Sequence, residues 1–411
     1  MLRLCSHIHI SYGRFRVFSC KHSKKYIHSP IPIISQKITS LSINQTEYAK
    51  TLADSLIQGN RYSLARAITL LESSKAERRA EGQYILDAVI KHLAHQELKT
   101  GKFTFRIGLS GPPGAGKSTF IEAFGGRLTG SKPWNPVINT SYKSYGKQRL
   151  TLDEEHFNQE IRKLHRVAVL AIDPSSHTTG GSLLADKTRM PELSSNMNAY
   201  IRPSPSGGNL GGVARATSES ILLCEAAGFE TVLVETVGVG QLEFAAADMV
   251  DMFVLIIPPA GGDELQGIKR GIVEVADLVL VNKADGELLH QARLIAKEYS
   301  NALKYMRCRR PNWIPKVQLV SSLTGDGLIE FWSTAFKFHQ SLIKSGELQR
   351  IRKEQLRIWM WTFVKEEIWR RFKNNPLILE KQKEIETLLF NREIAPGIAA
   401  ELLLDIDHRK S

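Results

Sequence analysis

Residues 111–119 read Gly111-Pro112-Pro113-Gly114-Ala115-Gly116-Lys117-Ser118-Thr119, and they match the phosphate-binding pattern G-x-x-x-x-G-K-[ST] at every constrained position. Residues 105–110 before them have the composition of a short buried strand, and residues 120–128 after them have helical spacing. Such a loop opens a helix N-terminus, whose unpaired N–H groups and dipole attract phosphate. Lys117 would place a positive charge near the β and γ phosphates, and the Ser118 hydroxyl would ligate Mg²⁺. A chance glycine turn is the alternative, but the flanking strand and helix favour a nucleoside triphosphate site.

A second motif suggests which base is bound. Asn282-Lys283-Ala284-Asp285 has the form N-K-x-D and directly follows the apolar residues 278–281. A carboxylate at Asp285 can accept two hydrogen bonds from guanine, which adenine cannot supply, so the wrong base would leave it unpaired. After the next expected strand, residues 316–320, the chain reads Ser321-Ser322-Leu323, where GTPases place a backbone contact to the guanine carbonyl. Each match is weak alone, but three in this order at strand ends favour GTP over ATP.

The hydrolytic element is expected in residues 231–238, where an apolar strand ends in Glu235 three residues before Gly238. This is the D-x-x-G layout with Glu in place of Asp. Glu235 would hold the Mg²⁺ shell or orient the attacking water, and the Gly238 N–H would sense the γ-phosphate. Together with Lys117, Glu235 is the catalytic candidate. Because Val239 stands where small GTPases have a water-positioning Gln, we expect slow intrinsic hydrolysis of about 10⁻⁴ to 10⁻² s⁻¹, which a partner accelerates.

Further blocks of sequence resemble the P-loop GTPase chaperones of the MeaB/ArgK type, and the resemblance covers about residues 47–408. The blocks are AIDPSS (171–176), GGSLLADKTRM (180–190), ETVGVGQ (235–241), DMVD (248–251) and PAGGDELQGIKRGI (259–272). The last block is not a motif that GTPases share in general, so it separates this family from other guanine-nucleotide switches.

The resemblance implies a GTPase that gates adenosylcobalamin loading into methylmalonyl-CoA mutase and protects or reactivates that enzyme. It also implies a mitochondrial matrix protein that forms a homodimer, with a cobalamin adenosyltransferase as a further partner and no tightly bound cofactor of its own. The implied Mg²⁺ ligands are Ser118, Asp173, Asp186 and Glu235. The implied partner-facing switch contains Asp263, Gln266 and Lys269. From the residues alone, Asp173 follows the apolar residues 167–172 and lies at a strand end where ligands collect, but an Asx turn before Pro174 is the alternative.

The net charge of +13 does not indicate nucleic-acid binding, because it is concentrated near the N-terminus. Residues 1–46 contain Lys and Arg but no acidic residue. We therefore assign residues 1–40 to a mitochondrial transit peptide, with a disordered basic tail as the alternative. No apolar run approaches the ~18 to 20 residues that span a membrane. The four cysteines have no CxxC or Cys-His spacing, so neither a disulfide framework nor a zinc site is indicated.

The expected fold is α/β, a mostly parallel sheet with helices on both faces, because strands near residues 105, 168, 200, 232, 254, 279 and 317 are mostly separated by helical or glycine-rich stretches. Strand order is not readable from the sequence. The expected units are an N-terminal helical segment (41–100), a GTPase domain (101–340) with an insertion (130–163), and a C-terminal helical arm for dimerisation (341–411). The insertion, longer than relatives need, is either a surface loop or a gene-model artefact such as a retained intron.

The arm is predicted from an aromatic stripe at helical spacing: Leu356, Trp359, Met360, Phe363, Val364, Ile368 and Phe372. Intramolecular packing is the alternative to a subunit interface. Two other protein classes also remain open. A P-loop small-molecule kinase would need an acceptor pocket and an Arg-rich lid, and a targeting GTPase would be expected to have a Met-rich domain, whereas this chain has only seven Met.

Overall fold

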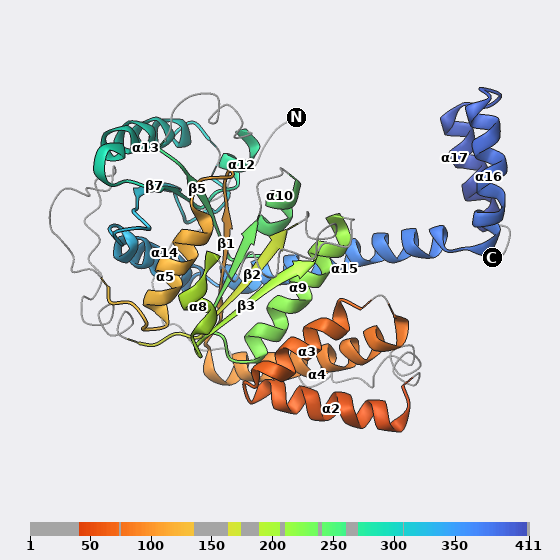
Figure 1. The fold of residues 1–411 in the computed structure, drawn as a ribbon, viewed down its shortest axis with the longest axis horizontal. Helices are drawn as coiled ribbons and strands as arrows, with labels where there is room; N and C mark the ends of the chain where they lie inside the picture. Colours follow the sequence, from red (N-terminus) through yellow and green to blue (C-terminus); the bar gives the residue numbers. More distant parts are fainter. Residues whose placement is uncertain are drawn as a thin grey trace, which may run out of the picture.

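Figure 1 shows a sheet at the centre of the molecule, three helices below it and a helical arm that extends away from it. The computed structural model describes residues 41–73, 75–134, 163–173, 189–205, 210–236, 241–259, 270–306 and 308–408. The expected transit peptide (1–40) and most of the expected insertion lie outside these ranges.

Three helices precede the sheet: α2 (Ile43–Ile57), α3 (Arg61–Leu71) and α4 (Ala76–Thr100). Ser42 begins α2 with a reciprocal pair of hydrogen bonds to Gln45, which satisfies two N–H groups at the helix start. Gly101 ends α4 in the left-handed conformation at φ 63°. The apolar faces of these helices are buried against α9 (Leu210–Ala226), so they form one core with the sheet.

The described residues form one seven-stranded sheet in the order β3-β2-β4-β1-β5-β6-β7, and all pairs are parallel. A strand is present at each of the seven predicted positions, so the α/β class with a parallel sheet is confirmed. The strands are β1 (Phe105–Ser110), β2 (Val167–Asp173), β3 (Ala199–Pro205), β4 (Thr231–Thr236), β5 (Met252–Ile257), β6 (Leu278–Val281) and β7 (Lys316–Leu319).

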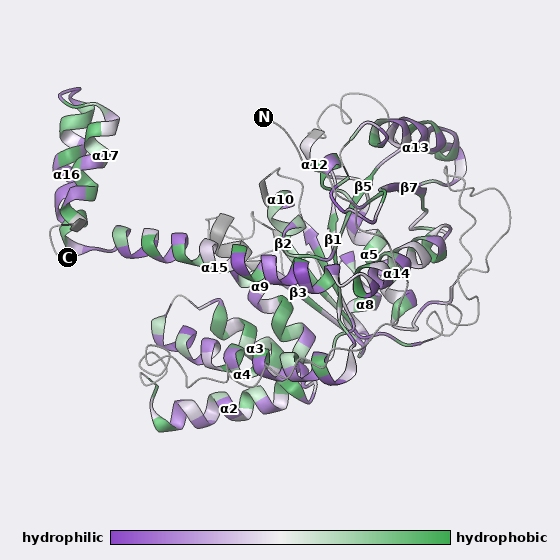
Figure 2. Ribbon diagram, turned by 180° about the vertical axis from the view of Figure 1, so that it is seen from behind, coloured by the Kyte–Doolittle hydropathy of each residue, from purple (hydrophilic) through white to green (hydrophobic). Residues whose placement is uncertain are grey.

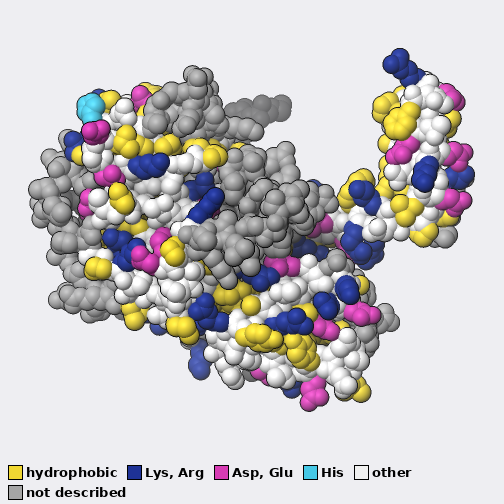
Figure 3. All heavy atoms as spheres, in the orientation of Figure 1, with side chains coloured by type: hydrophobic (Ala, Val, Ile, Leu, Met, Phe, Trp, Pro, Cys, Tyr) yellow, Lys and Arg dark blue, Asp and Glu magenta, His cyan; other side chains and the backbone are white. Residues whose placement is uncertain are grey.

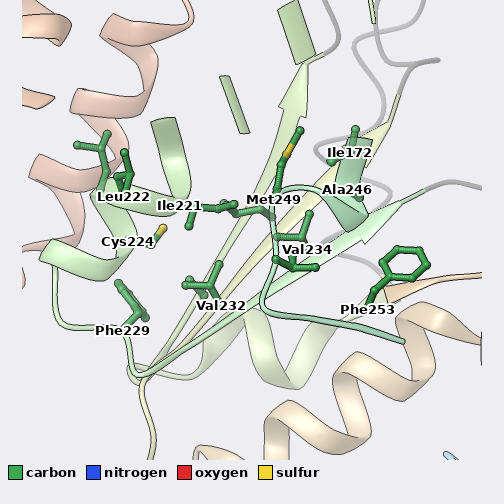
Figure 4. Close-up of a cluster of buried hydrophobic side chains, with 14 of the residues drawn as sticks. Ile172, Ile221, Leu222, Cys224, Phe229, Val232, Val234, Ala246, Met249 and Phe253 are labelled. Carbon is green, nitrogen blue, oxygen red and sulfur yellow. The ribbon is translucent and has the colours of Figure 1, made fainter. Parts of the chain in front are cut away.

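Helices cover both faces of the sheet, as predicted. Alternate strand residues enter two separate cores, because successive side chains of a strand point to opposite faces. In one of them, Ile221 and Cys224 of α9 lie near Val232 and Val234 of β4 (Figure 4). The face of the sheet with this core is covered by α9, α10 (Gln241–Ala247), α12 (Arg270–Glu274) and α13 (Leu289–Leu303), which follows the short 3-10 helix η2 (Gly286–Leu288). The opposite face is covered by α5 (Lys117–Leu128), α8 (Pro191–Ser195) and α14 (Leu328–Lys344).

The C-terminal arm consists of α15 (Glu347–Lys373), α16 (Pro376–Phe390) and α17 (Pro396–His408). The first part of α15 packs on the body, whereas its second part projects outward and carries the α16–α17 hairpin (Figures 1 and 2). The predicted aromatic stripe divides accordingly. Trp359 is buried and Phe363 packs on the core, while Met360 and Ile368 are exposed. Among the helices of the described residues, none has the length and apolar character needed to cross a membrane.

A buried network of charged groups joins the arm to the sheet. The Arg106 guanidinium, on β1, forms two hydrogen bonds to the Glu225 carboxylate of α9, at 2.7 and 2.8 Å. It also donates to Gln355 of α15 at 3.0 Å. Arg352, one turn before Gln355, pairs with the Asp251 carboxylate at 3.0 Å. Strand β1, helix α9 and the base of the arm are therefore held by one set of buried contacts.

In this network, the positive charges of the arginines stabilise the ionised form of the buried Asp251 carboxylate. Burial alone would raise the pKa of Asp251, but Arg352 and Arg106 outweigh burial and hold that pKa below its ordinary value. Asp251 also accepts a hydrogen bond from the backbone N–H of Arg106 at 3.0 Å. Breaking such a pair leaves one buried charge uncompensated, which costs more than the intact pair contributes.

We expect Arg106→Met to lower the free energy of unfolding by about 3 to 5 kcal/mol, because the Glu225 carboxylate would lose its bidentate partner in the interior. Replacing both residues, in Arg106→Met with Glu225→Leu, should recover part of that loss. Urea denaturation measures both variants. The control is Arg357→Met, which removes an exposed pair with Glu354 on α15 and should change stability little. Equal effects of Arg106→Met and the control would contradict the importance of the network.

Candidate nucleotide site

The phosphate loop connects β1 to α5, and its glycines have conformations that other residues would not tolerate. Gly111 has φ 153°, and a Cβ there would lie 1.9 Å from the carbonyl oxygen of Ile256 on β5. Gly116 has φ 86°, and a Cβ there would lie 2.6 Å from Nδ2 of Asn282. Helix α5 begins at Lys117, three residues earlier than the predicted helix, so Lys117 to Thr119 form its first turn. The loop therefore presents a helix N-terminus at the carboxyl edge of the sheet.

Lys117 is folded back onto this loop. Its Nζ donates to the carbonyl oxygens of Gly111 at 2.7 Å and Pro112 at 3.1 Å, and the side chain is only 8% exposed. Burial lowers the pKa of Lys117, and the nearby carboxylates of Glu235 and Glu243 oppose that shift. A phosphate that enters the loop could take the place of these carbonyl acceptors and form a stronger, charge-assisted hydrogen bond.

The hydroxyl of Ser118 and the carboxylate of Glu235 meet at the start of α5. Ser118 Oγ donates to Glu235 Oε1 at 3.0 Å, although the two residues come from different elements. The parallel register places Glu235 on β4 beside Leu109 on β1, next to the phosphate loop. Strand β2 pairs with β4 on its other side, with Ile172 opposite Thr236, so the backbone of Asp173 reaches the same sheet edge. These oxygen donors are of the kind that Mg²⁺ prefers.

The N-K-x-D motif contacts the phosphate loop directly. Asn282 Nδ2 donates to the Ala115 carbonyl oxygen at 2.9 Å, and Asn282 Oδ1 accepts from both the backbone N–H and the hydroxyl of Ser322, at 3.2 and 2.8 Å. Asn282 is 1% exposed. One buried amide therefore links the loop after β1, the loop after β6 and the loop after β7.

Asp285, the last residue of the N-K-x-D motif in the loop after β6, is half-buried. Its Oδ2 accepts a hydrogen bond from the hydroxyl of Ser321, which in turn accepts one from the backbone N–H of Thr324 at 3.1 Å. These contacts fix the direction of the carboxylate. Lys283 is exposed with φ 57°, and the side chain of Leu323 is also exposed. The carboxylate of Asp285 can accept hydrogen bonds from a ligand, and the ammonium of Lys117 can donate hydrogen bonds to a phosphate.

Five residues predicted for the site lie outside the described residues: Gly238, Asp186, Asp263, Gln266 and Lys269. The side chain of Asp173 is likewise not described. The sequence did not predict one carboxylate that lies near the phosphate loop, that of Glu243. Glu243 of α10 accepts a hydrogen bond from the hydroxyl of Ser110, the last residue of β1, at 3.1 Å. Its only sequence signal was a position shortly after the ETVGVGQ block, and this does not reveal which residue it contacts.

Proteins with similar sequences are named as GTPases or belong to a GTPase family, in agreement with a nucleotide site at this edge of the sheet. The family model described as "Methylmalonyl Co-A mutase-associated GTPase MeaB" matches residues 64–133 and 143–377. A protein of Mus musculus named "Methylmalonic aciduria type A homolog, mitochondrial" is 49% identical over 366 residues, which are 89% of this chain and 80% of that protein. "GTPase ArgK" of Escherichia coli is 41% identical over 321 residues, 77% of this chain and 85% of that protein.

A solved structure is similar along nearly the whole chain. The "Crystal structure of LAO/AO transport system kinase" superimposes with a TM-score of 0.61 at 30% sequence identity, covering 90% of this chain and 99% of that one. The similarity therefore includes the sheet and the helices on both of its faces.

Replacing the loop lysine tests the phosphate site. We expect Lys117→Ala to weaken binding of GTP and GDP at least 100-fold while leaving the fold intact, because a buried charge-assisted contact is lost. Isothermal titration calorimetry with Mg²⁺ measures affinity, and circular dichroism checks the fold. The control is Lys304→Ala, which changes an exposed lysine at the end of α13. Unchanged nucleotide affinity in Lys117→Ala would contradict the assignment.

Replacing the carboxylate of the N-K-x-D motif tests base selection. We expect Asp285→Ala to reduce the preference for GTP over ATP by about 100-fold or more, since guanine would lose two hydrogen bonds to a charged group. Ser321→Ala should reduce it less, because the carboxylate remains but loses one of its orienting contacts. Competition of ATP and GTP for a fluorescent guanine nucleotide measures the ratio. If Asp285→Ala retained the preference, another group would have to read the base.

Proposed function

Because this chain belongs to the MeaB family of methylmalonyl-CoA mutase-associated GTPases and hydrolyses GTP, we propose that it is a chaperone of methylmalonyl-CoA mutase. In this role, GTP hydrolysis gates adenosylcobalamin loading into the mutase and protects or reactivates that enzyme. The observation that carries the proposal is the hydrogen-bonded junction of the phosphate loop with the N-K-x-D motif, in a chain that matches the family model over residues 64–133 and 143–377.

Within this proposal, residues 111–119 bind the phosphates, and Lys117 neutralises the β and γ groups during transfer. Gly238 senses the γ-phosphate. Asp285 reads guanine, supported by Asn282, Lys283 and the loop Ser321-Ser322-Leu323. The contacts from Asn282 to Ala115 and from Ser321 to Asp285 support this division of roles, because they place both halves of the site in one hydrogen-bonded unit.

We also propose a Mg²⁺ site made by Ser118, Asp173, Asp186 and Glu235. The hydrogen bond from Ser118 to Glu235 supports it, since a hydroxyl and a carboxylate oxygen already converge beside the phosphate loop. The bound ion would neutralise charge on the phosphate oxygens. Glu235 then has a second task, which is to hold the attacking water in line. With Val239 in place of a water-positioning Gln, intrinsic turnover is slow and the mutase accelerates it.

The partner-facing switch in this proposal contains Asp263, Gln266 and Lys269, which come between β5 and β6 in the sequence. We propose the mitochondrial matrix as the location, because several relatives carry "mitochondrial" in their names. A cobalamin adenosyltransferase is a further proposed partner. It would supply the cofactor whose loading this protein gates.

We further propose that the arm forms a homodimer. Figure 3 shows apolar side chains at the surface of the α16–α17 hairpin. Four large apolar residues of the hairpin are at least half exposed: Leu379, Phe390, Ile398 and Leu404. Together with the exposed residues Met360 and Ile368 of α15, they offer an apolar surface that a second copy would cover.

The mutase proposal is tested by measuring GTP hydrolysis with and without a purified adenosylcobalamin-dependent methylmalonyl-CoA mutase. We expect stimulation of about tenfold or more, because the partner completes a site that lacks a water-positioning Gln. Heat-unfolded mutase is the control. If neither stimulation nor a complex on gel filtration were observed, the mutase role would be wrong while the GTPase assignment would stand.

Glu235→Gln separates hydrolysis from binding. We expect it to slow single-turnover hydrolysis by about 100-fold or more but to weaken GTP·Mg²⁺ binding much less, because the amide cannot orient water as the carboxylate does. Glu298→Gln, which changes an exposed carboxylate on α13, is the control. Equal losses of binding and hydrolysis in Glu235→Gln would mean that Glu235 mainly holds the metal.

A further inference from the structure

Helix α15 contacts α9 at two points along its length. At the base of the arm, Arg352 Nη1 lies 3.6 Å from Glu225 Oε1 of α9 and donates to Glu97 Oε1 of α4 at 3.3 Å. Farther along α15, the ring of Phe363 lies under the Arg215 guanidinium of α9, whose central carbon is 4.8 Å from the ring centroid. The two points are about 16 Å apart along α15, because a helix rises by about 1.5 Å per residue. Helices α9 and α15 are therefore attached to each other over several turns.

The Arg215 guanidinium is in turn held in place from helix α4. Its Nε donates to Glu219 Oε1, one turn farther along α9, at 3.3 Å. The same carboxylate oxygen accepts a hydrogen bond from Gln83 Nε2 of α4 at 2.7 Å. Glu219 is only 3% exposed, so these contacts form in the interior, where the loss of a partner is costly. A continuous series of side chains thus connects the N-terminal helices to α15, in the order Gln83, Glu219, Arg215 and Phe363.

The two points of attachment have different consequences for the arm. Arg352 belongs to the buried ionic network that joins α15 to the sheet, so it fixes where the helix starts. A single point of attachment does not fix the direction of a rod, whereas a second point at a distance does. The contact at Phe363 is such a second point, because a guanidinium is attracted to the face of an aromatic ring. Since α15 continues to Lys373 and carries the α16–α17 hairpin, a small rotation about its base displaces the hairpin by a larger distance.

We propose that Arg215 is a positioning residue through which the N-terminal helices set the direction of the arm. Gln83 and Glu219 hold the guanidinium, and the guanidinium holds Phe363. Without this contact, α15 stays attached at its base while its outer part swings relative to the body. Residues 41–100 thereby have a task that is separate from nucleotide binding. The proposal rests neither on GTP hydrolysis nor on the mutase role.

Double electron–electron resonance measures the direction of the arm as a distance between two spin labels. The labels are attached to genetically encoded keto amino acids at two exposed positions, Lys344 at the end of α14 and Lys383 on α16. An excess of unlabelled chain removes distances between copies. We expect Arg215→Met to widen the distribution of this distance at least about twofold, because methionine keeps an apolar contact with the ring but lacks the cation. The control is Arg357→Met, which removes an exposed pair with Glu354 on α15 and should leave the distribution unchanged.

Two further variants test the two ends of the series of contacts. Phe363→Leu removes the aromatic face but keeps a large apolar side chain, and Gln83→Met removes the hydrogen bond from α4. Both should widen the distribution, while a second label pair on Lys50 of α2 and Lys344 should keep its distance in every variant. An unchanged arm distribution in folded Arg215→Met and Phe363→Leu variants would overturn the proposal, as would a change in the second distance, because the body itself would then have moved. A wide distribution in Arg215→Met with an unchanged one in Gln83→Met would overturn the role of the N-terminal helices.

Discussion

The nucleotide site depends on the close parallel packing of β1 between β4 and β5. On one side, the register sets Leu109 beside Glu235 and brings a carboxylate to the first turn of α5. On the other side, the bare backbone of Gly111 passes the carbonyl group of Ile256 so closely that no side chain fits. With a larger residue the loop would be displaced from the edge where α5 begins. The phosphate loop is thus shaped by its two neighbouring strands as much as by its own sequence.

The same central strand also positions the arm, through its other end. Arg106 connects to α9 and α15, and Arg352 and Asp251 complete the contacts on the side of the arm. Replacing both partners of a buried pair by apolar residues recovers stability that is lost when only one is replaced, so the ionic contacts also serve to fix one geometry of the arm. These charged groups set the orientation of the first part of α15 on the sheet, and the outward part of α15 continues in the same direction because it belongs to the same helix.

Much of this structure could be predicted from the sequence because the signals are local. Buried strands are short apolar runs, and the phosphate loop and Asn282 to Asp285 are contiguous motifs. What could not be predicted depends on contacts between distant residues. Strand order depends on which strands pair in space, and the contacts of Ser110 with Glu243 and of Arg106 with Glu225 join side chains more than a hundred positions apart. The stripe on α15 shows the same limit, because its spacing predicts an apolar face but not that Trp359 is covered and Met360 is not.

The amide of Asn282 has one more consequence. It bonds to the carbonyl of Ala115 in the phosphate loop and to Ser322 in the loop after β7. Because the same buried side chain holds both loops, a displacement of either loop would strain its contact with the other. The two loops therefore keep a fixed spacing, which limits how far apart the two ends of a bound ligand can lie.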